Sequence, residues 1–142
     1  MFFLKTRMAA RDVAASLAER AASGPTPVGA LLRATRNSLD GFAFALKSER
    51  AFRQEAVALA LAVPLACALT PDPFHRALLI GVLMLAMAVE LLNTCAEKIC
   101  DLVMPQRHPM VKAVKDMGSA AVLCALGACL LLWGGAAMAR LG

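Results

Sequence analysis

The sequence contains no tyrosine, one tryptophan and two histidines, and aromatic residues make up only 5% of its 142 positions. Proteins that bind nucleic acid by base stacking need aromatic side chains among their basic ones. We therefore expect no nucleic-acid partner, although the net charge is +5. No C-x-x-C pair or Cys/His cluster occurs among the five cysteines, so the sequence predicts neither a zinc site nor a disulfide framework.

Charge is scarce over three long stretches of the chain. Ala56 to Pro71, Ala77 to Val89 and Met117 to Ala139 contain no Asp, Glu, Lys or Arg, and 60% of the whole sequence is hydrophobic. A helix of about 20 apolar residues can cross a bilayer. A soluble three-helix bundle is disfavoured, because a soluble helix needs a polar face and the last stretch has none. We predict an all-α membrane protein with three transmembrane helices, at about residues 54–70, 74–100 and 118–138.

The segment before these stretches has a different pattern. Over residues 28–48, apolar side chains such as Val28, Leu31, Leu32 and Leu39 recur at helical spacing, opposite basic ones. This predicts an N-terminal amphipathic helix, which either lies in the membrane surface or packs against its own bundle. Residues 1–27 end in the linker-like AASGPTP and are predicted to be a mobile extension, so the domain itself spans 28–142.

The basic residues are distributed unevenly about the apolar stretches. Nine of the fifteen Lys and Arg precede the first stretch, Arg76 stands alone between the first two, four lie between the second and third, and only Arg140 follows. Lys and Arg are enriched in cytoplasmic loops. The predicted topology therefore has a cytoplasmic N-terminus, an outer first loop, a cytoplasmic second loop at MPQRHPMVKAVKD and an outer C-terminus.

Polar side chains recur along the second predicted span. Glu90, Asn93, Glu97 and Asp101 are 3, 4 and 4 residues apart, which places them on one side of a helix. Acids inside a membrane are costly and persist where they face a partner or a cavity. Ion pairs with basic residues of neighbouring helices, a proton or cation pathway in an ion-conducting oligomer, and a site of chemistry all remain open on spacing alone.

Three segments resemble a known family. FRQE at 52–55, VELLNTCAEKICD at 89–101 and KDMGSAAVL at 115–123 are similar to the small bacterial integral-membrane diacylglycerol kinases, and the resemblance covers residues 30–142. It implies a homotrimer in the bacterial inner membrane that uses ATP to phosphorylate diacylglycerol. Undecaprenol kinase, a relative with similar motifs, is the alternative. The phosphate-binding motifs of soluble kinases, G-x-x-x-x-G-K-[ST] and G-x-G-x-x-G, are absent.

The resemblance also implies roles for individual residues. The family's catalytic base matches Glu90, its metal-binding glutamates match Glu49 and Glu97 with Mg²⁺ as cofactor, and Asn93 is a supporting residue. The implied nucleotide contacts are Ser38, Glu49, Glu97, Gln106, Arg107, His108, Lys115 and Asp116. The implied lipid-substrate contacts are Ala51, Phe52, Arg53, Gln54, Glu55, Glu90 and Ser119. A nucleotide-contacting arginine of the family is replaced by Ala30, and Arg33 lies one turn further on.

Overall fold

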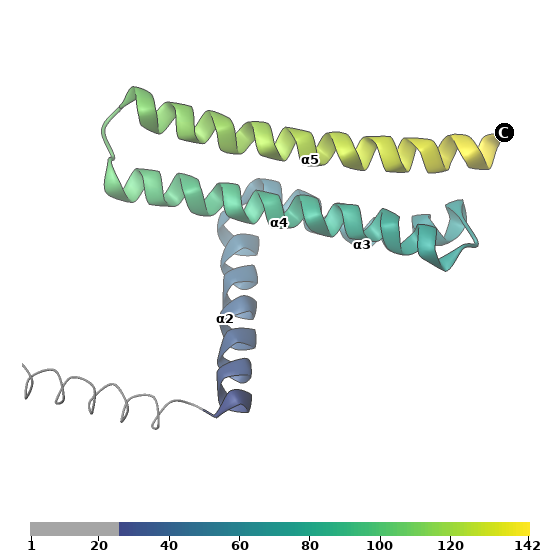
Figure 1. Ribbon diagram of the computed structural model, residues 1–142, viewed down its shortest axis with the longest axis horizontal. Helices are drawn as coiled ribbons and strands as arrows, with labels where there is room; N and C mark the ends of the chain where they lie inside the picture. Colours follow the sequence, from purple (N-terminus) through teal and green to yellow (C-terminus); the bar gives the residue numbers. More distant parts are fainter. Residues whose placement is uncertain (1–25) are drawn as a thin grey trace, which may run out of the picture. The chain divides into compact units, whose positions relative to one another are not determined.

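The computed structural model describes residues 26–142, so the predicted mobile extension at 1–27 lies almost wholly outside the described residues. The described part is helical, with α2 (Pro27–Ser48), α3 (Arg50–Leu69), α4 (Pro73–Val103) and α5 (Pro109–Leu141), and contains no strand (Figure 1). Helices α3, α4 and α5 are each long and apolar enough to cross a membrane. The predicted fold class, an all-α membrane protein with three spanning helices after an N-terminal helix, is confirmed.

The chain divides into two units, Met1–Phe42 and Ala43–Gly142. The described part of the first unit consists mainly of α2, whose apolar side chains at Val28, Leu31 and Leu32 are about two-thirds exposed. The second unit holds the end of α2 and the three long helices. In it α4 packs against both α3 and α5, and Figure 1 shows α4 and α5 running side by side in opposite directions.

The contacts among α3, α4 and α5 are made largely by small side chains. Ala62 and Ala66 on α3, Ala86 on α4 and Cys129 on α5 are buried, together with the larger Leu79. Small residues let membrane helices approach closely, so that dispersion contacts can hold them together. Most large apolar side chains of this unit are exposed, as an environment of lipid or of further protein chains would require.

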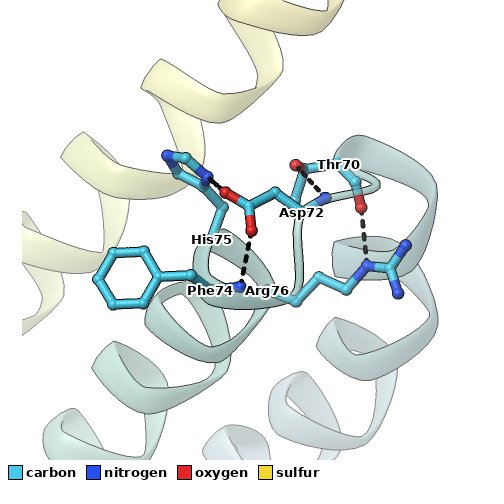
Figure 2. Close-up of polar contacts among 5 residues, drawn as sticks. All are labelled: Thr70, Asp72, Phe74, His75 and Arg76. Carbon is cyan, nitrogen blue, oxygen red and sulfur yellow. Dashed lines mark hydrogen bonds and ion pairs between the residues drawn. The ribbon is translucent and has the colours of Figure 1, made fainter.

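The connection between α3 and α4 is a short polar turn (Figure 2). The Asp72 carboxylate accepts a hydrogen bond from the Phe74 backbone N–H at 2.9 Å and pairs with the His75 ring. The first of these bonds, followed by the His75 contact, lowers the pKa of Asp72 below its ordinary value of 3.8. Arg76 Nε donates to the Thr70 carbonyl at 2.8 Å, so side chains satisfy backbone groups at both helix ends.

The connection between α4 and α5 is shorter than predicted. The prediction of a loop over MPQRHPMVKAVKD is wrong from Pro109 onward, because α5 begins there and the loop is only Met104–His108. The predicted third span at about 118–138 lies within α5 and stays a prediction. Proline suits the first position of a helix, and His108 Nδ1 accepts a hydrogen bond from the Met110 N–H at 3.2 Å. Lys115 and Asp116 therefore belong to the first turns of a helix.

Candidate active site

The polar stripe of α4 is present on the folded helix. Asn93 Nδ2 donates to Glu97 Oε1 at 3.3 Å, one turn further along. Glu90 lies one turn before Asn93 and is 8% exposed, which makes it the only buried charged side chain among residues 26–142. Glu97 and Glu49 are both close enough to repel the Glu90 carboxylate electrostatically, and Glu55 is repelled by Glu90. Glu90 thus links four carboxylates electrostatically, and Glu49, Glu55, Glu90 and Glu97 are named together the acidic cluster.

Glu49 reaches this cluster from the junction of α2 and α3. It is the residue before α3 and has an extended backbone, with φ −107° and ψ 123°, but its side chain does not cap the helix. Instead Glu49 Oε1 accepts from Ser48 Oγ at 2.9 Å and pairs with Lys98 Nζ at 2.8 Å. The Lys98 ammonium and then the Ser48 hydroxyl hold the pKa of Glu49 below its ordinary value of 4.5.

The carboxylates of Glu49 and Glu97 suit Mg²⁺, although they do not form a complete cage. Among residues 26–142 there is no group of three His, Cys, Asp or Glu side chains arranged to hold a metal ion. Mg²⁺ in nucleotide sites is usually bound through one or two carboxylates, with phosphate oxygens and water completing its octahedron. Glu49 and Glu97, which both act electrostatically on Glu90, provide that number of carboxylates. The residues present therefore fit a metal that arrives with a nucleotide.

A cavity of about 660 Å³ lies at the α4–α5 loop. Its volume is within the usual range for small-molecule sites, which is roughly 300–1,000 Å³. Five of the predicted nucleotide contacts line this cavity: Gln106, Arg107, His108, Lys115 and Asp116. The structure thus brings together the residues from the loop and those from the start of α5.

Two ion pairs cross or border this cavity. Lys115 Nζ lies 2.6 Å from Asp101 Oδ1, joining α5 to the C-terminal end of the α4 stripe, and Lys112 pairs with Asp116 one turn along α5. The interpretation of the stripe as a set of structural ion pairs therefore holds for Asp101. It does not hold for Glu90, which has no ion pair with a described basic residue.

The predicted lipid contacts at residues 51–55 form the first turn of α3. Phe52 is 1% exposed and belongs to the core, whereas Ala51, Arg53 and Gln54 are exposed. Arg53 donates to the carbonyls of Leu46 and Lys47, at 3.3 and 3.1 Å, and so satisfies the end of α2. Glu55 Oε2 is buried and has no hydrogen-bond partner in the part of the chain that the structure describes. This turn therefore combines a buried anchor with polar groups that remain accessible.

Two predicted site residues stand apart from these contacts. Ser38 belongs to the first unit, where its hydroxyl donates to the Ala34 carbonyl at 3.0 Å. Ser119 is exposed on α5. Their predicted contacts with nucleotide and lipid stay predictions.

Two other residues of the site were not predicted from the sequence. Lys98 follows Glu97 directly and so lies off the stripe, and its pairing with Glu49 depends on how α4 meets the α2–α3 junction. Gly118 packs against Asn93: a Cβ at this position would lie 2.1 Å from Asn93 Oδ1. The glycine in KDMGS is the only sequence signal for the Gly118–Asn93 contact. The Lys98–Glu49 pair has no sequence signal.

Comparison with known proteins agrees with this description. Residues 36–136 match the family model for prokaryotic diacylglycerol kinase. The diacylglycerol kinase of Pseudomonas aeruginosa strain PAO1 is 43% identical over 110 residues, which cover 78% of this chain and 89% of that protein. The diacylglycerol kinase of Escherichia coli K12 is 42% identical over 117 residues, 79% of this chain and 96% of that protein. The match of family model and relatives over most of the chain shows that it belongs to the prokaryotic diacylglycerol kinase family.

Proposed function

We propose that the protein transfers the γ-phosphoryl group of ATP to the primary hydroxyl of diacylglycerol, forming phosphatidic acid at the cytoplasmic face of a bacterial inner membrane. Relatives at 42–43% identity are named diacylglycerol kinase. The observation that carries the proposal is Glu90, a buried carboxylate on a membrane-spanning helix that has no ionic partner among residues 26–142. Such groups inside membranes mark functional sites by default.

Glu90 is proposed as the general base. The lipid hydroxyl gives its proton to the Glu90 carboxylate while the hydroxyl oxygen attacks the γ-phosphorus of ATP. A new oxygen–phosphorus bond forms, the bond to the oxygen that bridges the β- and γ-phosphorus breaks, and ADP leaves with that oxygen. Asn93 holds Glu97 by its hydrogen bond and keeps the next acid of the stripe in a fixed orientation one turn away.

Phosphoryl transfer requires mainly positioning and neutralisation of phosphate charge. Glu49 and Glu97 would hold the Mg²⁺ ion, which, when bound with ATP, neutralises charge on the transferring phosphate. The cavity at the α4–α5 loop would hold the nucleotide, with Lys115 as a compact positive charge for phosphate. Gln106, Arg107 and His108 would contact the nucleotide from the loop, Ser38 from α2, and residues 51–55 with Ser119 would contact the lipid.

A homotrimer with cytoplasmic N-termini is the proposed assembly. The three spanning helices leave most of their large apolar side chains exposed, and α5 buries only Cys129. One chain therefore covers little of its own apolar surface, and neighbouring chains would cover more of it. The excess of Lys and Arg before the first span supports the orientation.

The decisive experiment measures ATP turnover by purified protein in mixed micelles, with diacylglycerol and undecaprenol offered side by side. We expect turnover with diacylglycerol, and a fall of roughly 10²-fold or more in Glu90→Gln, because the amide cannot accept the proton. Asp72→Asn is the matched control: it also converts a carboxylate to an amide, but at the α3–α4 turn, where Asn is an equally good helix cap. Its turnover should equal that of the parent.

Folding, oligomeric state and nucleotide binding of Glu90→Gln are measured on the same samples and should match the parent. A folded Glu90→Gln oligomer with near-parent turnover would show that Glu90 is not the base. If turnover is found only with undecaprenol, the phosphoryl-transfer chemistry stands and the lipid assignment is wrong. Glu90→Asp provides a second probe, because a base that needs close contact with the hydroxyl slows when its carboxylate is withdrawn by one methylene.

A further inference from the structure

Lys98 is ion-paired with Glu49, one of the two proposed metal ligands. Its ammonium lies 2.8 Å from Glu49 Oε1 and 5.4 Å from the centre of the Phe44 ring, so it is held by an ion pair and by a cation–π contact. The Lys98 side chain is 49% exposed, whereas that of Glu49 is only 25% exposed. The lysine is therefore the more solvent-accessible member of the pair.

The acidic cluster explains why a cation is needed there. Glu90 feels the negative charges of Glu97 and Glu49, and Glu55 feels that of Glu90. Like charges repel, most strongly at the buried Glu90, so a cation near these carboxylates is favourable. Within residues 26–142, Lys98 makes the only ion pair to any of the four carboxylates.

We propose that Lys98 is an internal counter-ion of Glu49, which a divalent cation must displace when it binds with the nucleotide. The inference rests on the proposed function, in which Glu49 is a metal ligand. Lys98 is thus a positioning residue: it stabilises the acidic cluster in the metal-free protein and weakens metal binding by competing for the same oxygen. When the divalent cation displaces Lys98, one cation replaces another. A positive charge therefore offsets the negative charge of the acidic cluster both with and without metal.

The competition predicts the direction of each effect. Without Lys98 the metal no longer has to break an ion pair and meets one positive charge less, so the metal should bind more tightly. A half-exposed ion pair and one screened neighbouring charge together correspond to an affinity gain of about threefold to tenfold. The metal-free protein should become less stable, because nothing then offsets the repulsion among the four acids.

The test measures Mn²⁺ binding by electron paramagnetic resonance, on full-length protein in micelles with a non-hydrolysable ATP analogue. Lys98→Met and Lys98→Gln both remove the charge and should tighten Mn²⁺ binding about threefold to tenfold. Lys98→Arg keeps the charge and should bind as the parent does. Lys47→Met is the matched control, because it removes an exposed lysine two residues before Glu49 that forms no ion pair with a described acid.

A double-mutant cycle with Glu49→Gln shows whether Lys98 acts through Glu49. In the Glu49→Gln background, Lys98→Met should not tighten Mn²⁺ binding further. Equal Mn²⁺ affinities for the parent and both neutral variants would overturn the proposal. So would weaker binding of the analogue in the absence of metal, which would make Lys98 a phosphate contact. Absence of Mn²⁺–nucleotide binding in the parent itself would instead refute the proposed function, on which this inference depends.

Discussion

Adding a single methyl group at Gly118 should disturb the candidate active site, although Gly118 itself has no proposed role in the reaction. This glycine lies on α5 and faces Asn93 of α4, and a Cβ built on it would be 2.1 Å from Asn93 Oδ1. Real atoms do not approach so closely, so Gly118→Ala must move the Asn93 amide. Asn93 Nδ2 donates to Glu97 Oε1, and this movement should therefore break the hydrogen bond that orients Glu97.

The cost of Gly118→Ala can be worked from these contacts. Overpacking a closely packed site costs about 1–3 kcal/mol. The clash is with the end of a side chain rather than with backbone, which favours the lower half of that range. The lost hydrogen bond adds about 0.5 kcal/mol, since at 3.3 Å it is long and weak. Alanine gains about 1 kcal/mol over glycine in helix propensity, so the expected net destabilisation is about 0.5–1.5 kcal/mol.

The assay is thermal unfolding in detergent, followed by circular dichroism, with turnover measured on the same samples. Gly127→Ala is the matched control, because it lies on the same helix and a Cβ there meets nothing within 4 Å. We expect Gly118→Ala to unfold at lower temperature than Gly127→Ala and to lose activity. Asn93→Ala combined with Gly118→Ala should cost less than the sum of the two changes, because the clash is then gone. Equal unfolding temperatures for Gly118→Ala and Gly127→Ala would refute the reasoning.

Three further predictions concern the metal, the topology and the α3–α4 turn. Glu97→Gln should weaken Mg²⁺-dependent nucleotide binding by removing one of two proposed carboxylate ligands, and an unchanged affinity in equilibrium binding would contradict that role. Cysteines placed at Pro73 and Gln106 in a cysteine-free background should react with a membrane-impermeant maleimide from opposite sides of the membrane; labelling of both from the periplasm would show that the topology is wrong. Asp72→Ala should lower the unfolding temperature at neutral pH, because the Phe74 N–H loses its acceptor. Because the pKa of Asp72 is below 3.8 in the folded protein, this difference should persist at neutral pH and shrink as the pH falls through the folded pKa.

The helices could be predicted because their signals lie along the sequence. Absence of charge over 13 to 23 residues marks a membrane helix, and helical spacing marks α2, so all four helices were predicted near their observed positions. The start of α5 was missed because Lys112, Lys115 and Asp116 gave that segment the composition of a loop. The His108–Pro109 cap, a local signal of helix start, outweighed that composition.

The partners of the charged residues could not be predicted in the same way. Spacing places Glu90, Asn93 and Glu97 on one side of α4, but it does not say what that side faces. The Asp101–Lys115 and Glu49–Lys98 pairs join residues 14 and 49 positions apart, and each depends on the rotation of one helix against another. The contact between Gly118 and Asn93 also depends on how α5 is rotated against α4. Roles that rest on resemblance, such as those of Ser38 and Ser119, need binding data.

The length of α4 links the acid stripe to the proposed reaction. Its 31 residues extend about 46 Å at a rise of 1.5 Å per residue, whereas a bilayer's hydrocarbon core is about 30 Å thick. If the polar turn before Pro73 marks the outer boundary, Glu90 lies about 26 Å along the helix, just inside the opposite boundary. Glu97 and Asp101 then lie about 36 and 42 Å along it, beyond the hydrocarbon core. A diacylglycerol hydroxyl stays near its headgroup level, while ATP stays in water. The stripe therefore places the proposed base where the lipid hydroxyl can reach it, and the proposed metal ligand Glu97 about two turns further on, where a phosphate from the cytoplasm can.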